Sequence, residues 1–160
     1  MNNMENRNLK EIEPDEMALC LQKYIAHTFN DMLGVTVIKY QQGYCMTRTA
    51  IRPEFTNPIG SIHGGLLCTI ADTTAGISTI RIEEDSTVTT ISSDMQFLRP
   101  AMNLSHIYCQ AEMIKDGRRI AFADVKLMTE DGILLAKGSF TFARIQLPGP
   151  KKRDTTDLNQ

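Results

Sequence analysis

The sequence predicts a single α+β domain, in which an antiparallel β-sheet wraps around one long central helix. Residues 62–80 read IHGGLLCTIADTTAGISTI, a nearly uncharged run with the length and apolarity of a buried helix. Beyond it, segments rich in β-branched residues are separated by Asp-Gly dipeptides, which are strong hairpin signals. Because this helix is apolar on nearly all sides, it must be covered, and a curled sheet would cover it.

An extra helix is predicted before the sheet, at residues 14–33. Pro14 suits a first helical turn, and Asp15 and Glu16 suit its positively charged end. Apolar residues then recur at helical spacing as far as Gly34, which is a typical helix stop.

The remaining elements follow from β-branched runs, from turn residues and from the apolar run. In order, we expect strands at 35–40 and 44–51, a loop at 52–61, the central helix at 63–81, and strands at 86–98, 103–115, 119–129 and 133–145. The last four strands are expected to form a meander, because Asp116-Gly117 and Asp131-Gly132 favour tight turns between them.

Length and charge limit the possible organisation. A chain of 160 residues fits one domain, which we place at residues 14–146, with a flexible arm at 1–13 and a disordered tail at 147–160. The net charge of −2 gives no field that would attract nucleic acid or an anionic membrane. Residues 1–10 lack the apolar core of a signal peptide, so a cytoplasmic location is expected.

Several other classes are not favoured. A transmembrane helix at residues 62–80 is disfavoured by Asp72, since a central Asp costs about 2.5–3.5 kcal/mol on insertion. The cysteines form no C-x-x-C pair and are expected to be small core residues: Cys20, Cys45, Cys68 and Cys109. Neither a G-x-S-x-G motif nor a phosphate-binding glycine motif is present, and we expect no metal and no cofactor.

Asp72 is the only carboxylate in the apolar run. Burying an ionised carboxylate costs several kcal/mol unless the group is paired, hydrogen-bonded or solvated in a cleft. The residue is therefore either structurally satisfied or chemically active. The same run opens with His63-Gly64-Gly65, which leaves backbone N–H groups open at a helix start. Together the two features indicate an enzyme.

The spacing of His63 and Asp72 predicts a shared site. Nine residues at about 100° each place them on opposite helix faces, separated by more than about 13 Å along the axis. They cannot serve one reaction within one chain. A two-fold homodimer would bring each His63-Gly64 to the Asp72 of its partner and create two equivalent sites.

The motifs resemble those of a known family. These are Asn57-Pro58-Ile59-Gly60-Ser61-Ile62-His63-Gly64-Gly65, then Asp72, then Thr89-Thr90-Ile91, and finally Phe97-Leu98-Arg99-Pro100-Ala101. Over residues 35–144 the chain resembles the hotdog-fold acyl-CoA thioesterases of the phenylacetate-degradation type. The resemblance implies a hotdog fold, an acyl-CoA substrate, and a homodimer that usually assembles into a homotetramer.

Thioester hydrolysis suggests a role for each residue. The Gly64 N–H would stabilise the oxyanion, and Asp72 would act either as general base or as nucleophile, two routes that the sequence does not separate. The resemblance implies that Thr90 orients the water or the carboxylate, that Asn57 lies near the thioester carbonyl, and that His63 organises the loop. Each of these residues also has a purely structural interpretation, such as helix capping, close packing or a turn.

Several further residues are candidates for contacting the substrate. Gly65, Arg99, Arg118 and Arg119 are candidates for binding the coenzyme A portion, although the arginines also suit solvated turns. Met46, Met95 and Phe97 are candidates for the acyl pocket, whose preferred chain length is left open. The extra helix at 14–33 is expected to cover either that pocket or a sheet edge.

Two alternative functions remain. A hotdog module of this kind can bind acyl-CoA without turning it over, in a regulatory role, since a fold does not fix a function. A hydratase or dehydratase is the other alternative. It is less favoured, because those hotdog enzymes use a different acid–histidine arrangement.

Overall fold

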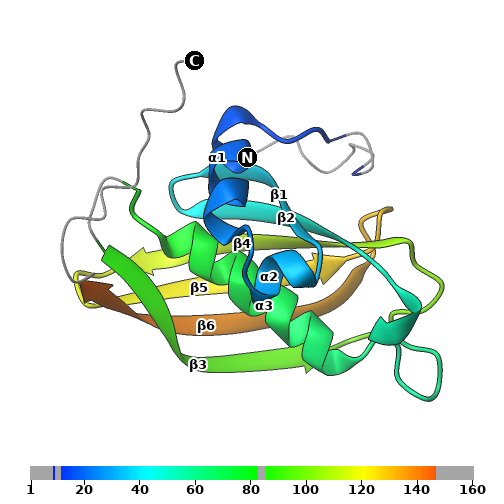
Figure 1. Cartoon of the computed structure of the whole chain (residues 1–160). Helices are drawn as coiled ribbons and strands as arrows, with labels where there is room; N and C mark the ends of the chain where they lie inside the picture. The colour runs from blue at the N-terminus through cyan, green and yellow to red at the C-terminus, as the bar shows by residue number, and fades with distance from the viewer. Residues whose placement is uncertain (1–8, 10–11, 83–85, 147–160) are drawn as a thin grey trace.

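The computed structural model describes residue 9, residues 12–82 and residues 86–146. These residues form an α+β fold in which one antiparallel sheet curves around a long helix, as the sequence predicts (Figure 1). The helices and strands are α1 (Glu16–Ile25), α2 (Phe29–Met32), β1 (Val35–Gln41), β2 (Tyr44–Ala50), the short 3₁₀ helix Pro53–Phe55, α3 (Gly64–Thr79), β3 (Ser86–Phe97), β4 (His106–Asp116), β5 (Ile120–Met128) and β6 (Leu134–Gln146).

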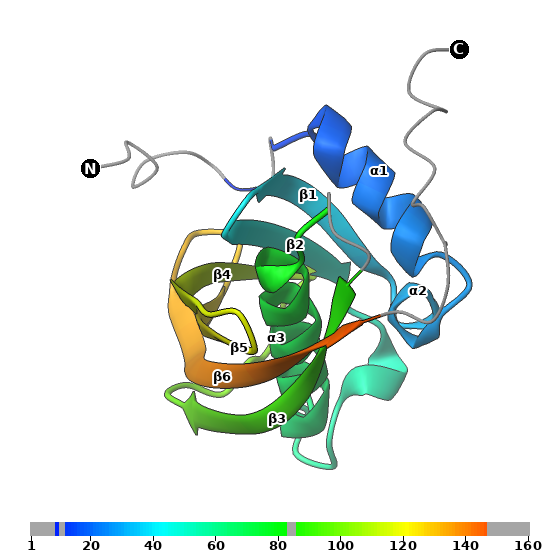
Figure 2. The ribbon, with the colours of Figure 1, turned by 90° about the vertical axis from the view of Figure 1, so that its left-hand side faces the viewer.

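The sheet has the strand order β1-β2-β4-β5-β6-β3. The expected four-strand meander is therefore wrong at its first strand: β4, β5 and β6 are consecutive neighbours, but β3 pairs with β6 and forms an edge (Figure 2). The Asp-Gly turns give the correct β4–β5 and β5–β6 hairpins because they are local signals. The β3–β4 connection has no such dipeptide, and it passes β6 and β5 to reach β4 in the middle of the sheet.

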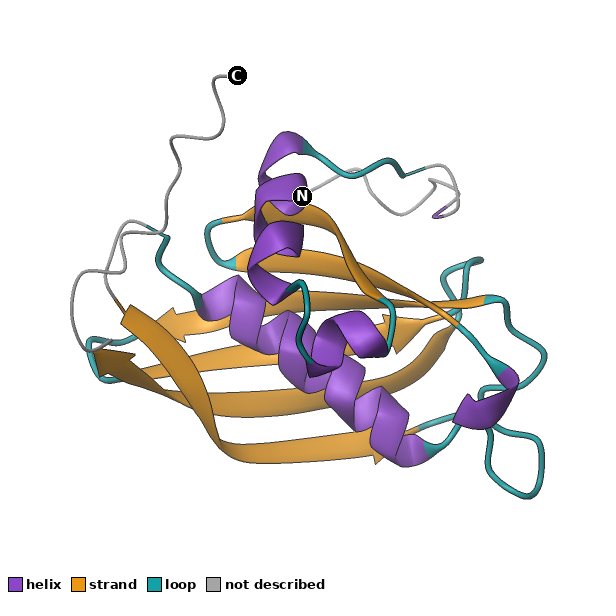
Figure 3. Ribbon diagram, viewed as in Figure 1, coloured by secondary structure: helices purple, strands orange, loops and turns teal. Residues whose placement is uncertain are grey.

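The central helix α3 lies within the curve of the sheet (Figure 3). Its buried side chains include Ile70, Ala71 and Ala75, which pack on inward-facing residues of β4, β5 and β6. The Thr47 and Thr74 hydroxyls lie 2.7 Å apart and hydrogen-bond each other in this interior. Burial of so many side chains of α3 explains why its sequence carries almost no charge.

The N-terminal helical region is broken rather than continuous, so the single helix expected at residues 14–33 is corrected to two. Asp15 caps α1 by accepting a 2.7 Å hydrogen bond from the Ala18 N–H. The chain then turns at His27, whose φ of 60° lies in the left-handed region. The Asp31 carboxylate accepts a bond from the His27 N–H at 3.0 Å and stabilises this turn.

The outer face of the sheet carries a second apolar cluster. Met46 is fully buried there against Tyr44 and Tyr108, and Leu9 and Ile12 cover it. Residues 1–8 and 147–160 lie outside the described part of the chain. The expected flexible arm at 1–13 and disordered tail at 147–160 therefore stay predictions, as does the domain boundary at 14–146.

The two edges of the sheet differ. The β1 edge is covered by α1: the Gln22 side chain accepts a bond from the Val37 N–H at 2.8 Å and donates to the Val35 carbonyl at 3.2 Å. The Asp15 carboxylate accepts another from the Tyr40 N–H at 3.2 Å. Among the described residues, nothing covers the outer edge of β3 in this way. β3 is therefore an open edge strand in the single chain.

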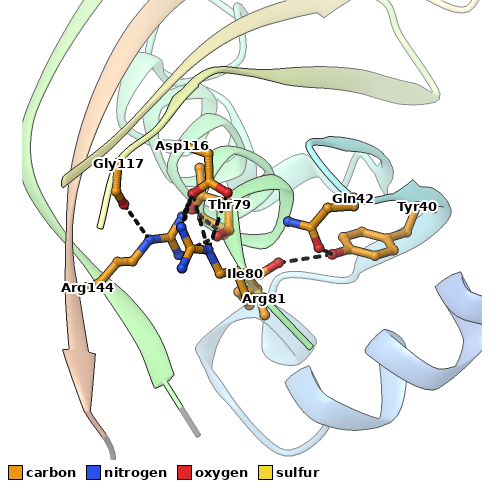
Figure 4. Close-up of polar contacts among 9 residues, drawn as sticks. Tyr40, Gln42, Thr79, Ile80, Arg81, Asp116, Gly117 and Arg144 are labelled. Carbon is orange, nitrogen blue, oxygen red and sulfur yellow. Dashed lines mark hydrogen bonds and ion pairs between the residues drawn. The ribbon is translucent and has the colours of Figure 1, made fainter. Parts of the chain in front are cut away.

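A cluster of charges joins the C-terminal end of α3 to the β4–β5 hairpin (Figure 4). The buried Arg144 guanidinium donates to the Thr79 carbonyl at 2.9 Å and to the Gly117 carbonyl at 3.0 Å, and it also pairs with Asp116. Arg81 pairs with the same carboxylate at 2.8 Å. The hydrogen bond from Arg81, with the charge of Arg144 added, lowers the pKa of the Asp116 carboxyl. The cluster is a structural clamp at the end of α3.

None of the described helices has both the length and the apolarity needed to cross a membrane.

Candidate active site

Asp72 and Thr90 form the polar centre of the candidate site. The Thr90 hydroxyl donates a 2.6 Å hydrogen bond to Asp72 Oδ1, linking the middle of α3 to the edge strand β3. Asp72 is half-buried rather than enclosed in the core. Its carboxylate is thus satisfied on one side by a hydroxyl and open on the other, which is the arrangement needed by a carboxylate that meets a ligand.

A cavity of about 630 Å³ opens beside this pair, within the size range of small-molecule sites. Its walls come from α3, from β3 and from residues 24–30 at the α1–α2 turn. Cys68 also lines the cavity, and burial raises the pKa of its thiol. The thiol therefore stays protonated at neutral pH, which leaves Asp72 as the better candidate for chemistry.

His63 caps the start of α3. Its Nδ1 atom accepts a 2.9 Å hydrogen bond from the Gly65 N–H. A Cβ on Gly65 would come within 2.9 Å of that nitrogen, so the cap requires a glycine there. The geometry therefore gives His63 and Gly65 a structural role, as the cap of α3. In this role the Nδ1 atom of the imidazole is a hydrogen-bond acceptor.

Gly64 provides the first N–H of α3, and no acceptor within the described residues bonds to it. The Phe97 ring lies beside it, since a Cβ on Gly64 would meet that ring at 3.4 Å. Both residues line a second cavity of about 260 Å³, together with Arg99 and Leu98. An open N–H at a helix N-terminus is a donor for a developing negative charge.

The two halves of the expected site do not meet in one chain. Gly64 lines the smaller cavity and Asp72 the larger one. Eight residues of continuous helix separate them, which corresponds to a rise of about 12 Å. A site that used both groups would therefore need a second chain, which stays a prediction.

Asn57 organises the loop before α3. Its side-chain oxygen accepts hydrogen bonds from the Ile59 N–H at 3.2 Å and from the Ser61 N–H at 3.1 Å. Its backbone N–H donates to the Ser61 carbonyl at 2.7 Å. These bonds fix the loop that leads to His63, and Asn57 lines neither of the two cavities described above.

The three candidate arginines lie in different places. Arg99 lines the smaller cavity and donates from Nη1 to the Leu134 carbonyl at 2.8 Å. Arg118 and Arg119 are exposed in the β4–β5 hairpin, next to the Asp116 clamp at the opposite end of α3. Within one chain, therefore, Arg118 and Arg119 lie far from Arg99 and do not form one basic cluster with it.

The candidate acyl-pocket residues also separate. Met46 is wrong as a pocket residue, because it is fully buried in the outer-face cluster on the other side of the sheet. A β-strand alternates its side chains, so one step in register decides which face a residue joins. Phe97 lines the smaller cavity, and Met95 packs against the main core.

Sequence reasoning missed the polar link between α2 and α3. The Thr73 hydroxyl donates a 2.7 Å hydrogen bond to Asn30 Oδ1, one residue beyond Asp72. Tyr24 and Phe29 from the same N-terminal region line the larger cavity. No motif marks these residues, and of them only Tyr24 falls on the helical spacing of the predicted N-terminal helix.

Known proteins that are similar to this chain include thioesterases. The model of the thioesterase superfamily matches residues 59–136. Acyl-coenzyme A thioesterase 13 from Homo sapiens is 28% identical over 118 residues, covering 72% of this chain and 84% of that protein. The corresponding Mus musculus protein is 26% identical over 108 residues, covering 67% of this chain and 77% of that protein.

Solved structures share the fold. A thioesterase from Haemophilus influenzae superposes with a TM-score of 0.74 at 21% identity, covering 82% of this chain and 92% of that chain. The E. coli PaaI protein from the phenylacetic acid degradation operon gives a TM-score of 0.71 at 19% identity, covering 78% and 89%. Residues 59–136, which carry Gly64, Asp72 and Thr90, thus match the model of the thioesterase superfamily, and the chain has the hotdog fold.

Proposed function

We propose that this protein hydrolyses acyl-CoA thioesters to a free acid and coenzyme A. The observation that carries the proposal is the Asp72–Thr90 hydrogen bond, whose two residues both line the larger cavity. The superfamily match and the name of the 28% identical human relative support the same activity.

The proposed chemistry uses two groups from different chains. Asp72 either removes a proton from a water that attacks the thioester carbonyl, or attacks that carbonyl itself to give a mixed anhydride that water then cleaves. The oxyanion formed at the carbonyl accepts a hydrogen bond from the Gly64 N–H of the second chain. Thr90 holds the carboxylate in orientation, Asn57 and His63 shape the loop, and Gly65 permits the cap.

We place the contact between the two chains of the homodimer at the outer edge of β3. α1 side chains satisfy the backbone of the β1 edge, whereas no strand of the described residues pairs with the outer edge of β3 beside Thr90. Pairing two β3 strands across a two-fold axis would satisfy both edges and bring two α3 helices together. Further assembly into a homotetramer belongs to the same proposal.

The coenzyme A contacts and the location belong to the same proposal. Arg99 lies at the cavity next to Gly64, and Arg118 and Arg119 are exposed on a hairpin that a dimer would carry to a partner's site. Their guanidinium groups suit phosphates. All four cysteines are free thiols, which fits a reducing compartment such as the cytoplasm.

Release of free thiol from a panel of acyl-CoA substrates tests the proposal, with wild type, Asp72→Asn and Asp131→Asn compared. Asp131 is an exposed carboxylate in the turn between β5 and β6, lines neither cavity, and serves as the matched control. Asp72→Asn should lower kcat by about 10²–10⁴-fold with folding intact, and Asp131→Asn should leave it unchanged. Binding of acyl-CoA without turnover by wild type would contradict hydrolysis and favour a binding module.

A further inference from the structure

Glu130, in the turn between β5 and β6, is a buried carboxylate that the proposed chemistry does not use. It accepts a hydrogen bond from the Ser105 hydroxyl, and His106 Nδ1 lies 3.3 Å from the same carboxylate oxygen. Burying an ionised carboxylate is costly unless such partners surround it. Both partners lie where the β3–β4 connection enters β4, so Glu130 joins one turn of the sheet to a distant connection.

The turn that carries Glu130 is held by its own hydrogen bonds. The Thr129 N–H donates to the Ile133 carbonyl at 3.0 Å, and the Gly132 N–H donates to the Thr129 carbonyl at 3.0 Å. The Thr129 hydroxyl accepts a third bond, from the Ile133 N–H at 3.1 Å. Glu130 is therefore mounted on a well-fixed part of the sheet.

Residues 98–105 connect β3 to β4, and we call this segment the strap. Its first residues are bound to β6, because the Leu98 and Arg99 N–H groups donate to the Leu135 carbonyl at 2.9 and 3.1 Å. Its last residue, Ser105, is bound to Glu130. The strap has no helix or strand of its own, so these attachments to the sheet determine its path.

The strap in turn holds both ends of the loop that leads into α3. The Ser105 carbonyl accepts a 2.8 Å hydrogen bond from the Ile51 N–H, at the start of the loop. The Ala101 carbonyl accepts a 2.8 Å bond from the Ile62 N–H, two residues before Gly64. The strap also forms one wall of the smaller cavity, which Gly64 lines. A displaced strap would therefore displace the Gly64 N–H.

We infer that Glu130 is a positioning residue for the Gly64 N–H: with Ser105 and His106 it holds the strap, and through the strap it places the start of α3. The inference rests on the proposed hydrolysis, in which this N–H donates to the oxyanion. Glu130 itself does not touch the substrate. Such a donor acts only at hydrogen-bonding distance, so a shift of about 1 Å is enough to slow the reaction strongly.

The first test compares kcat and KM for one good acyl-CoA substrate in wild type, Glu130→Ala, Glu130→Gln and Glu112→Ala. Because the oxyanion forms only during the reaction, Glu130→Ala should lower kcat by about 10- to 100-fold with little change in KM. Glu130→Gln keeps an oxygen that accepts the Ser105 bond and should retain most of the activity. A folded Glu130→Ala variant as active as wild type would overturn the inference.

Two further variants complete this series. Glu112 is an exposed glutamate of β4 that lines neither cavity, so Glu112→Ala is the matched control and should behave like wild type. Ser105→Ala removes only the hydroxyl that Glu130 binds. It takes the place of Glu130→Ala if that variant does not fold, and it should also lower kcat while KM changes little.

Mixed dimers show on which half of the shared site Glu130 acts. Glu130→Ala should impair the half that contains Gly64 and leave Asp72 of the same chain intact. Refolded with an equal amount of Asp72→Asn, it should recover about a quarter of wild-type activity, and refolded with Gly64→Val it should recover none. A merely structural defect would give no recovery in either mixture. Recovery with Gly64→Val alone would place Glu130 on the Asp72 half and overturn the inference.

The position of the Gly64 N–H is also measurable without turnover, by NMR of the backbone amides. Glu130→Ala should shift the Gly64 resonance and speed solvent exchange of the neighbouring Gly65 N–H, which the His63 cap binds. Glu112→Ala and Glu130→Gln should leave both unchanged. If wild type hydrolyses no thioester, the proposed function fails and this measurement alone decides the inference. Unchanged amides in Glu130→Ala would overturn it, whether or not wild type is active.

Discussion

The Thr90 hydroxyl lies 2.6 Å from Asp72 Oδ1, and this hydrogen bond joins the edge strand of the sheet to the middle of the central helix. One oxygen of the carboxylate is thereby fixed. Because Asp72 also lines the larger cavity, a change at Thr90 should alter the orientation of its carboxylate there.

Replacing Thr90 by Val removes the hydroxyl and keeps the branched shape of the side chain. A hydrogen bond to a charged group is worth about 1.5–3 kcal/mol, so kcat should fall by about 10- to 100-fold with little change in KM. Thr90→Ser retains the hydroxyl and should retain most of the activity. Steady-state kinetics on one good substrate checks both variants, and a Val variant as active as wild type would remove Thr90 from the site.

Mixing two inactive variants tests whether the active site is shared. Asp72→Asn lacks the acid, and Gly64→Val blocks the N–H at the start of α3. If each site combines Gly64 of one chain with Asp72 of the other, dimers refolded from an equal mixture should recover about a quarter of wild-type activity. A chain carrying both changes, refolded with an equal amount of either single variant, contributes no intact site and is the control. No recovery in mixed dimers of verified composition would contradict the shared site.

His63 is expected to act on stability more than on chemistry. His63→Ala removes the acceptor for the Gly65 N–H and should lower the free energy of unfolding by about 1 kcal/mol. His63→Asn, a good helix cap, should recover most of that loss. Urea unfolding measures the stability, and thiol release is followed in parallel. An Asn variant that is stable yet inactive would instead show that the imidazole takes part in the reaction.

The Asp116 clamp predicts a dependence of stability on acid pH. The folded-state pKa of Asp116 is below its ordinary value of 3.8, so its contribution is complete above about pH 4 and is lost as the pH falls through the folded-state pKa. Asp116→Asn should therefore be less stable than wild type at neutral pH, and the difference should shrink in acid.

Urea midpoints at about pH 7 and about pH 3 check this expectation. Asp131→Asn, in the exposed turn between β5 and β6, is the matched control and should behave like wild type at both values. A difference for Asp116→Asn that stays constant with pH would contradict the ion-pair explanation.

Local signals in the sequence predict much of this fold. The apolar run gives α3 within two residues at each end, and the Asp-Gly turns give the hairpins of β4, β5 and β6. These features depend on neighbours along the chain, which is why a pattern of residues is enough to identify them.

Features that depend on distant contacts were not predictable in this way. Nothing in the sequence of β3 shows that it pairs with β6, and His27 carries no signal that it takes a left-handed conformation and breaks the first helix. In the candidate site, the position of Thr90 near Asp72 came from the family resemblance. The Asn30–Thr73 bond came from neither source, because it joins segments that only the folded chain brings together.

Because the outer edge of β3 is open, the activity of the enzyme should depend on the protein concentration. A lone chain would present a row of unpaired backbone groups to any extended peptide, so dilution should promote both inactivity and aggregation rather than yield a stable working monomer. Activity per chain should then rise with concentration until assembly is complete. Variants that weaken pairing at this edge should show a lower yield of soluble protein before they show a lower turnover rate.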